Sequence, residues 1–407
     1  MKPLLLVLFP LFLMGCDDNQ IVINDPEPIK LKAGMEKRIQ QDNEFALDLF
    51  KQIIATSDEK NVFISPLSVS IALGMAWNGA DGDTKSEMAS TLKMAELTQE
   101  QINEYYQILL TALPKVDNST KLNIANSIWY RTGFPVKPAF LDMNRTYFNS
   151  EVRPLDFSKT GAVDTINNWC AEKTNQLIKK PLDKISADAM LYLINAIYFK
   201  GIWSKQFNKK DTREANFTTE DKQIVKVNMM NQTDTFAYHQ DETAQYLDMP
   251  YGNKSFSMTA ILPNDGKTTD DVLAVLDRQK WNSVVESLSG GTKKVIVSFP
   301  RFKHQAKYEL KTPLMNMGMI KAFDALQADF SPISDIDLVI SRILHSTYCE
   351  VDEVGTEAAA VTIIEFEMTS MPDVPVFNAN KPFIFVIREN STGVILFMGK
   401  MGAVQKH

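Results

Sequence analysis

Residues 349–371 read CEVDEVGTEAAAVTIIEFEMTSM, and the interpretation of the whole chain starts from this stretch. Charged and uncharged positions alternate along it, with Glu357, Glu365 and Glu367 at odd numbers. The even-numbered positions without charge are Thr356, Ala358, Ala360, Thr362, Ile364, Phe366 and Met368. Because side chains of a strand alternate between two faces, the pattern predicts a strand with its even face buried. Gly and Ala near its start are poor strand formers, so the segment is predicted to be able to leave and join a sheet.

The stretch resembles the hinge of the reactive-centre loop in the serpin family. The matching residues are Glu353, Gly355, Thr356, Glu357, Ala358, Ala359 and Ala360. Two further blocks resemble the family, NVFISPLSVSIALGMAWNGADGDTKSEM at residues 61–88 and NANKPFIFVIRENSTGVILFMGK at residues 378–400. The resemblance covers about residues 35–404. It implies an α+β serpin fold with large, mostly antiparallel sheets, about eight or nine helices and an exposed reactive-centre loop at about residues 353–373.

Composition and periodicity favour the same fold class. The 407 residues are 44% hydrophobic and 23% charged, and no linker divides them, so residues 35–407 are predicted to form one domain. Strand-like runs alternate with helix-like ones, as in α+β domains. Helices are expected at 35–54, 84–113 and 162–177, and strands at 122–130, 191–199, 224–230, 255–262, 295–300, 339–348, 374–377, 383–388 and 394–398.

The N-terminus differs from the rest of the chain. An apolar run at residues 4–14 follows Lys2, which indicates a signal peptide over residues 1–15 that is too short to span a bilayer. Residues 13–16, LMGC, resemble a bacterial lipoprotein box, which implies lipidation of Cys16. A plain secretory signal with an incidental Cys is the alternative. Residues 16–34 read as a polar tether of roughly 20 Å reach. The expected location is outside the cytoplasm, on a bacterial outer membrane or cell surface.

Motifs for catalysis or cofactor binding are missing from the sequence. It has four His and none of the HExxH, CxxC, GxSxG, GxGxxG or GxxxxGK[ST] patterns. The prediction is therefore a protein that is not an enzyme, uses no cofactor and holds no metal. A monomer is also expected. The net charge of −7 argues against a nucleic-acid partner. Cys170 and Cys349 are expected to be free, because a domain with a full core does not need a disulfide.

The family resemblance also implies a cluster beneath the main sheet, where two central strands separate to admit the loop. The matching residues are Ser65, Ser68, Asn195 and His345, with Trp203 at the end of the sheet where insertion begins. A buried polar cluster is costly unless each member is paired, so such a group can act as a latch between two arrangements. Without the resemblance, these would be ordinary residues of a core.

By resemblance, the protein is expected to be a suicide inhibitor of proteases. A protease cuts the loop, becomes covalently attached to it, and is trapped when the loop enters the sheet. Two counts along the loop disagree on the scissile bond. Met368-Thr369 is preferred, and Thr369-Ser370 and Phe366-Glu367 are alternatives. No Lys or Arg occurs between Arg342 and Lys381, so the loop offers no basic side chain to the acidic specificity pocket of a trypsin-like protease.

The expected targets are serine proteases of chymotrypsin-, elastase- or subtilisin-like specificity, with papain-like cysteine proteases as a further option. The alternative function is that of a non-inhibitory serpin-fold protein that binds a ligand or acts as a chaperone. The small residues of the hinge favour the inhibitor, because non-inhibitory relatives tend to have bulky or charged residues there.

Overall fold

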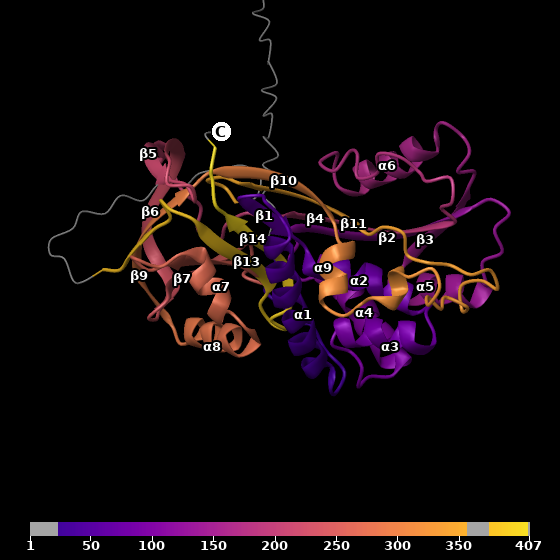
Figure 1. Cartoon of the computed structure of the whole chain (residues 1–407). Helices are drawn as coiled ribbons and strands as arrows, with labels where there is room; N and C mark the ends of the chain where they lie inside the picture. The colour runs from indigo at the N-terminus through magenta and orange to yellow at the C-terminus, as the bar shows by residue number, and fades with distance from the viewer. Residues whose placement is uncertain (1–22, 356–373, 406–407) are drawn as a thin grey trace, which may run out of the picture.

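The structure is a computed structural model, and it describes residues 23–355 and 374–405. Within these ranges the chain forms nine α-helices and three β-sheets, which confirms the predicted α+β class. Figure 1 shows β2, β3 and β4 edge-on, with α6 on one side of them and with α2, α4 and α5 on the other. None of the helices in the described ranges is long and apolar enough to cross a membrane.

The largest sheet has the strand order β1-β14-β13-β8-β7-β6-β9-β12, and β5 pairs with β6. Its pairs are antiparallel except β12 on β9, which is parallel. Strands β8, β13 and β14 are buried along their whole length, as their continuous apolar runs require. The bounds are β1 (Asn61–Ile64), β5 (Arg213–Thr218), β6 (Ile224–Gln240), β7 (Ala244–Tyr251), β8 (Phe256–Pro263), β9 (Thr292–Pro300), β12 (Val376–Asn378), β13 (Phe383–Glu389) and β14 (Ile395–Met401).

Two smaller sheets complete the strands. One has the order β3-β2-β4, with β3 (Ser150–Leu155) parallel to β2 (Lys121–Arg131) and β4 (Leu191–Lys200) antiparallel to β2. The other is the antiparallel pair of β10 (Phe302–Glu309) and β11 (Leu344–Val351). In the described residues no backbone hydrogen-bond ladder joins these two sheets. Strands β4 and β11 are therefore edge strands of their sheets.

The helices surround these sheets. Helix α2 is almost completely buried, and it begins at Pro66 with Ser65 as its cap, because Ser68 N donates to Ser65 Oγ at 3.3 Å. Three short 3₁₀ turns accompany the helices. The bounds are α1 (Met35–Ala55), α2 (Pro66–Trp77), α3 (Gly82–Thr91), α4 (Gln99–Ala112), α5 (Pro138–Phe148), α6 (Ala162–Lys173), α7 (Thr269–Val275), α8 (Arg278–Ser289), α9 (Lys311–Asn316), η1 (Leu113–Lys115), η2 (Lys209–Asp211) and η3 (Lys321–Phe323).

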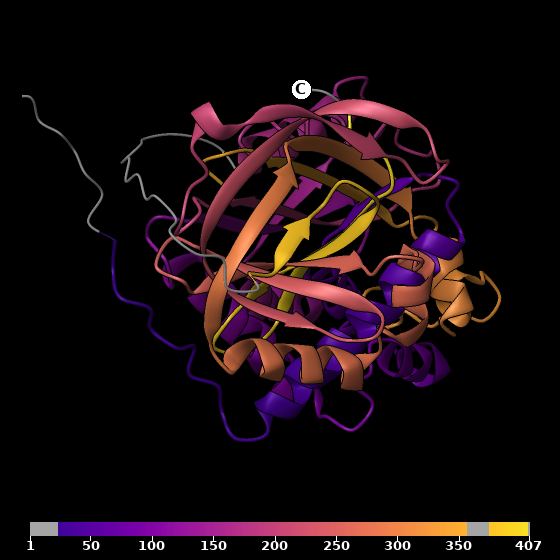
Figure 2. The same ribbon diagram turned by 90° about the vertical axis from the view of Figure 1, so that its left-hand side faces the viewer.

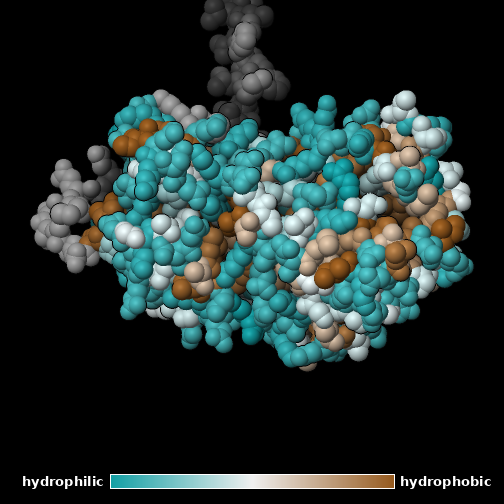
Figure 3. Space-filling model, in the orientation of Figure 1, coloured by the Kyte–Doolittle hydropathy of each residue, from teal (hydrophilic) through white to brown (hydrophobic). Residues whose placement is uncertain are grey.

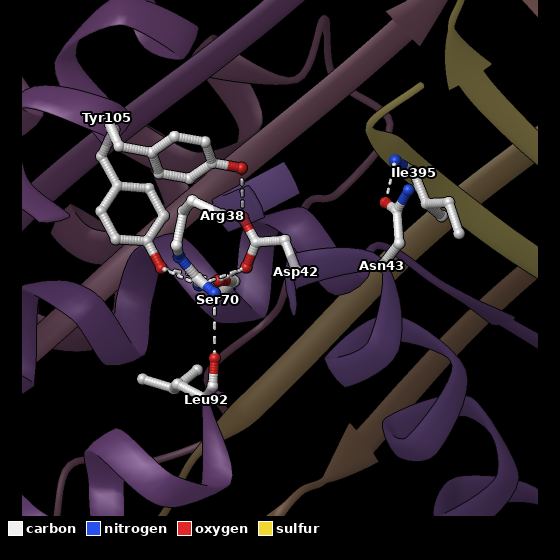
Figure 4. Close-up of polar contacts among 8 residues, drawn as sticks. Arg38, Asp42, Asn43, Ser70, Leu92, Tyr105 and Ile395 are labelled. Atoms are coloured by element: carbon white, nitrogen blue, oxygen red, sulfur yellow. Dashed lines mark hydrogen bonds and ion pairs between the residues drawn. The ribbon is translucent and has the colours of Figure 1, made fainter. Parts of the chain in front are cut away.

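Buried polar contacts hold α1 against α2 and α4. Figure 4 shows Asp42 of α1 at the centre, where it accepts hydrogen bonds from Arg38 at 2.6 Å, Ser70 at 2.7 Å and Tyr105 at 2.6 Å. The Arg38 guanidinium also donates to the carbonyl of Leu92 at 3.1 Å. Because every one of these side chains is buried, loss of either charge would leave its partner without compensation. This network therefore fixes the position of α2.

The described part of the expected tether, residues 23–34, lies on the domain. Asn24 N donates to Asn118 Oδ1 at 3.2 Å, and Asn118 N donates back to Asn24 Oδ1 at 3.0 Å. Further along, Ile29 is buried and its N–H donates to Ser391 Oγ at 2.9 Å. Residues 23–34 are consequently docked rather than a flexible spacer, and the reach calculated for the whole tether does not apply to them.

Most expected elements occur, with shifted ends. The expected helix at 84–113 is two helices, α3 and α4, and the expected strand at 224–230 continues to Gln240 as β6. The helix at 162–177 ends at Lys173, and the strand at 339–348 starts only at Leu344. Local patterns locate an element, but its ends depend on where its partner ends.

Candidate functional site

The candidate site is the boundary between β4 and β11. Within residues 23–355 and 374–405, β4 is paired only to β2, β11 is paired only to β10, and no backbone ladder joins β4 to β11. Both strands run toward the same end of the sheet, where Trp203, just after β4, contacts Asp352, just after β11. Two edge strands that face each other across one boundary offer hydrogen-bonding groups on both sides to an additional strand.

Side chains beneath the two strands connect them where their backbones do not. His345 of β11 accepts a hydrogen bond from Ser65 N at 2.9 Å. Ser68, on the same helix end, donates to Asn195 Oδ1 of β4. Asn195 then donates to Asn126 Oδ1 of β2 at 2.7 Å. The N-terminus of α2 thus bridges the boundary, and the structure brings together the four residues that the sequence placed in this cluster.

The environment of His345 determines its charge. It is buried, and burial lowers its pKa from the ordinary 6.5 to about 4, because taking the charged form of the ring out of water is costly. The neutral ring accepts at Nε2 and so carries its proton on Nδ1. Protonation of Nε2 would remove the acceptor that holds the first turn of α2.

Trp203 lies at the end of the boundary, in the corner where the reactive-centre loop would leave the sheet. Its ring stacks on Tyr251, with centroids 4.4 Å apart and an interplanar angle of 14°. Its indole N–H donates to the carbonyl of Asp352 at 3.0 Å, and its backbone N–H donates to the carbonyl of Val354 at 2.7 Å. This one residue therefore joins the end of β4 to the chain that follows β11.

The hinge residues Glu353 and Gly355 are held in the same corner. Glu353 is 1% exposed; one carboxylate oxygen accepts from Thr212 Oγ1 at 2.6 Å, and the other lies 3.5 Å from Nε of Arg301. Gly355 has φ of 149°, and a Cβ there would lie 2.2 Å from the carbonyl oxygen of Gly201. Only Gly fits this close approach of two backbones.

The remaining predicted site residues lie outside the described residues. They are Thr356, Glu357, Ala358, Ala359 and Ala360 of the hinge, Phe366, Glu367, Met368, Thr369 and Ser370 around the reactive bond, and Cys16 of the lipid anchor. The exact bond and the lipidation accordingly stay predictions.

Sequence reasoning missed several residues that complete the site. Asn126 extends the cluster to β2, Thr212 and Arg301 hold Glu353, and Tyr251 supports Trp203. Their signals in the sequence are weak, because single polar residues in strands and loops are common. Only the contacts themselves identify them.

The two cysteines in the described residues are not activated as nucleophiles. Cys170 and Cys349 are free, as expected, and burial raises the pKa of both thiols, that of Cys170 to about 12. Thiols that stay protonated in this way are unreactive. In residues 23–355 and 374–405 no group of His, Cys, Asp or Glu side chains has the arrangement of a metal site.

Comparisons with known proteins agree with this geometry. The family model described as serpin (serine protease inhibitor) matches residues 40–403. An uncharacterised serpin-like protein of Thermococcus kodakarensis is 34% identical over 378 residues, which cover 91% of this chain and 87% of that protein. The chain belongs to the serpin family.

Solved structures show the same fold. The thermophilic serpin tengpin in its native state matches with a TM-score of 0.84 and 34% identity, covering 94% of this chain and 98% of tengpin. Human thyroxine-binding globulin in complex with thyroxine matches with a TM-score of 0.83 and 27% identity, covering 91% and 99%. Serpins are generally protease inhibitors rather than catalysts, but the structural neighbours also include a thyroxine-binding protein.

Proposed function

We propose that this protein is an inhibitory serpin that traps serine proteases through insertion of its cleaved loop between β4 and β11. The observation that carries the proposal is the pair of facing strand edges, bridged from below by the Ser65, Ser68, Asn195 and His345 cluster. A chain that turns back after Gly355 would run antiparallel to both strands. It would then complete the hydrogen bonds of both edges.

The loop sequence suits this step. The residues that would enter first, Thr356, Ala358 and Ala360, are small. Farther along, Ile364 and Phe366 would become buried, and each would contribute roughly 1.5 to 3 kcal/mol. About fifteen residues at ~3.3 Å each span roughly 50 Å, which is enough to carry an attached protease along the length of the sheet and distort its active site.

The proposed reactive bond is Met368-Thr369, and the proposed targets have apolar specificity pockets. Chymotrypsin-, elastase- and subtilisin-like proteases meet that requirement, and papain-like cysteine proteases that read an apolar residue one position earlier are a further group. Trypsin is not expected to form a stable complex, since no Lys or Arg lies between Arg342 and Lys381.

We also propose that the monomer is exported and anchored to a bacterial membrane by lipid at Cys16. The apolar run at 4–14 and the LMGC sequence at 13–16 support this part of the proposal. Because residues 23–34 are docked on the domain, only the short segment between Cys16 and Asn24 would separate the anchor from the folded surface.

A second candidate is a non-inhibitory role in ligand binding. The observation that favours it is the structural similarity to thyroxine-binding globulin. The loop sequence argues for inhibition, because the inward-facing positions that would enter the sheet first, Thr356, Ala358 and Ala360, carry neither bulky nor charged side chains.

The test is incubation of the purified protein with elastase-, chymotrypsin- and subtilisin-type proteases, followed by electrophoresis in SDS. An SDS-resistant 1:1 adduct is expected for the unaltered protein. Ala358→Arg should abolish the adduct and leave simple cleavage, because its side chain belongs to the inward face. Ala359→Arg is the matched control: it makes the same change on the outward face and should preserve the adduct. Equal adduct yields from the two variants would refute insertion, and cleavage without any adduct would favour the ligand-binding role.

A further inference from the structure

Basic side chains gather around the two points where the reactive-centre loop joins the domain. The surface formed by residues 205–214, Asp234 of β6 and Lys293-Lys294 at the start of β9 holds six basic and three acidic residues, a net charge of +3, whereas the whole chain has −7. We call it the basic surface, and its members are Lys205, Lys209, Lys210, Arg213, Lys293 and Lys294, with Asp211, Glu214 and Asp234.

The loop leaves the domain beside the first part of the basic surface. Thr212, which donates to Glu353, directly follows the η2 turn that contains Lys209 and Lys210. Both Lys side chains are exposed. The first cations therefore stand next to the start of the loop.

The loop returns to the domain beside the second part of the basic surface. Ile296 N donates to the carbonyl of Pro375 at 2.9 Å, and Val376 pairs with Ile296 in the parallel β9-β12 ladder. Lys293 and Lys294 precede Ile296 by three and two positions on the same strand and are exposed.

A groove of about 600 Å³ with both polar and apolar side chains in its lining lies between these two points. Asp211 and Arg213 line it on the side of the loop's start, Ile296 and Asn378 line it on the side of its return, and Asn231 and Ser298 are among the residues between. Strands β5, β6 and β9 lie on the left of Figure 1, the side turned to the viewer in Figure 2. In Figure 3 the same end of the molecule is mainly hydrophilic, with smaller apolar areas.

Several cations of the basic surface form no ion pair within the part of the chain that the structure describes. There the ammonium groups of Lys209, Lys210 and Lys294 make no ion pair, and that of Lys293 lies 4.9 Å from the ring centroid of Tyr238. Lys205 differs, because it pairs with Asp234. Surface cations without partners add to the field that an approaching molecule meets.

We infer that the basic surface is a secondary docking site for proteases whose own surface is acidic around the active-site cleft. This rests on the proposed function, and it adds a preference that the loop sequence does not encode. A protease that binds the loop is tethered to the domain at the loop's two attachment points, and the basic surface lies beside both of them. Opposite charges there accelerate encounter by roughly 10- to 1,000-fold at low salt and lose this effect as salt rises.

A protease fits this surface better than a linear polyanion does. Asp211, Glu214 and Asp234 are interspersed among the cations, so the surface lacks the continuous run of positive charge that a polyanion requires. A protein partner can instead match alternating charges one by one.

The experiment compares two elastase-type proteases of the same loop specificity, one with an acidic and one with a basic surface. It measures the second-order association rate constant from low to high salt for the unaltered protein and for K209E/K210E and K293E/K294E. Each charge-reversed variant should associate roughly tenfold more slowly with the acidic protease at low salt, with convergence at high salt. The basic protease should associate at the same rate or faster. The matched control K179E/K180E reverses another exposed Lys pair, after α6, and should change neither rate.

A second measurement separates this inference from the proposed function. Equilibrium binding of the acidic protease with its catalytic Ser changed to Ala reports docking without covalent trapping. Docking that weakens in the variants, with no adduct from active protease, would retain the basic surface and remove the inhibitor function. If the charge-reversed variants bound the acidic and the basic protease with an equal loss of affinity, the inference would be overturned. The lysines would then act on the loop itself rather than on the protease surface. Binding of a sulfated polysaccharide that the variants lose, with protease docking unchanged, would overturn it as well.

Discussion

Acid should loosen the connection between the two smaller sheets, because His345 has to stay neutral to accept the hydrogen bond from Ser65. Burial lowers the pKa of His345 to about 4, whereas the same side chain in the unfolded chain has a pKa near 6.5. The unfolded chain therefore binds the proton first as the pH falls. The contribution of neutral His345 is complete above pH 6.5 and is lost between pH 6.5 and about 4.

The size of the effect follows from the difference between the two pKa values. Each unit corresponds to about 1.4 kcal/mol, so His345 alone should lower the free energy of unfolding by about 3 kcal/mol between pH 7 and pH 4. Carboxylates titrate over the same range. They do so equally in a variant that lacks only the imidazole. The difference in the free energy of unfolding between the two proteins therefore reports the titration of His345 alone.

The assay is urea unfolding of the unaltered protein and of His345→Asn at intervals from pH 7 to pH 4. At pH 7 the variant should be less stable by about 1 to 3 kcal/mol, because Ser65 N loses a well-placed acceptor. That deficit should shrink by about 3 kcal/mol toward pH 4 and can change sign. His239→Asn on β6 serves as the control. A deficit that stays constant from pH 7 to pH 4 would refute the reasoning.

Three other predictions concern the corner at the hinge and the docked N-terminal segment. Trp203→Phe removes the indole hydrogen bond but keeps an aromatic ring, so the free energy of unfolding should fall by about 1 kcal/mol in urea titrations; no change would mean that the bond contributes nothing. Gly355→Ala should lower thermal stability far more than Gly291→Ala, because both have positive φ but only the first Cβ meets backbone atoms; equal losses would contradict this explanation. Asn24→Ala should abolish the hydrogen-exchange protection of the Asn118 amide, and continued protection would show that residues 23–34 are not held by this pair.

Much of the fold could be predicted from the sequence, because its signals are local. The Ser65-Pro66 helix start and the apolar runs of β8, β13 and β14 each follow from neighbouring residues. Resemblance of three separate blocks to one family then identified the α+β fold. It also singled out Ser65, Ser68, Asn195 and His345 as a group before any distance was known.

Contacts between residues far apart in the chain were decided by the tertiary structure alone. Glu353 meets Thr212 across 141 positions, Asn118 meets Asn24 across 94, and Asn195 meets Asn126 across 69. No periodicity encodes such pairs, since a hydrogen bond forms where packing brings two groups together, whatever their separation along the chain. For the same reason, the sequence alone supplied the hypothesis of a reactive bond at Met368-Thr369, whereas only the folded chain shows that the two ends of this loop are flanked by a basic surface.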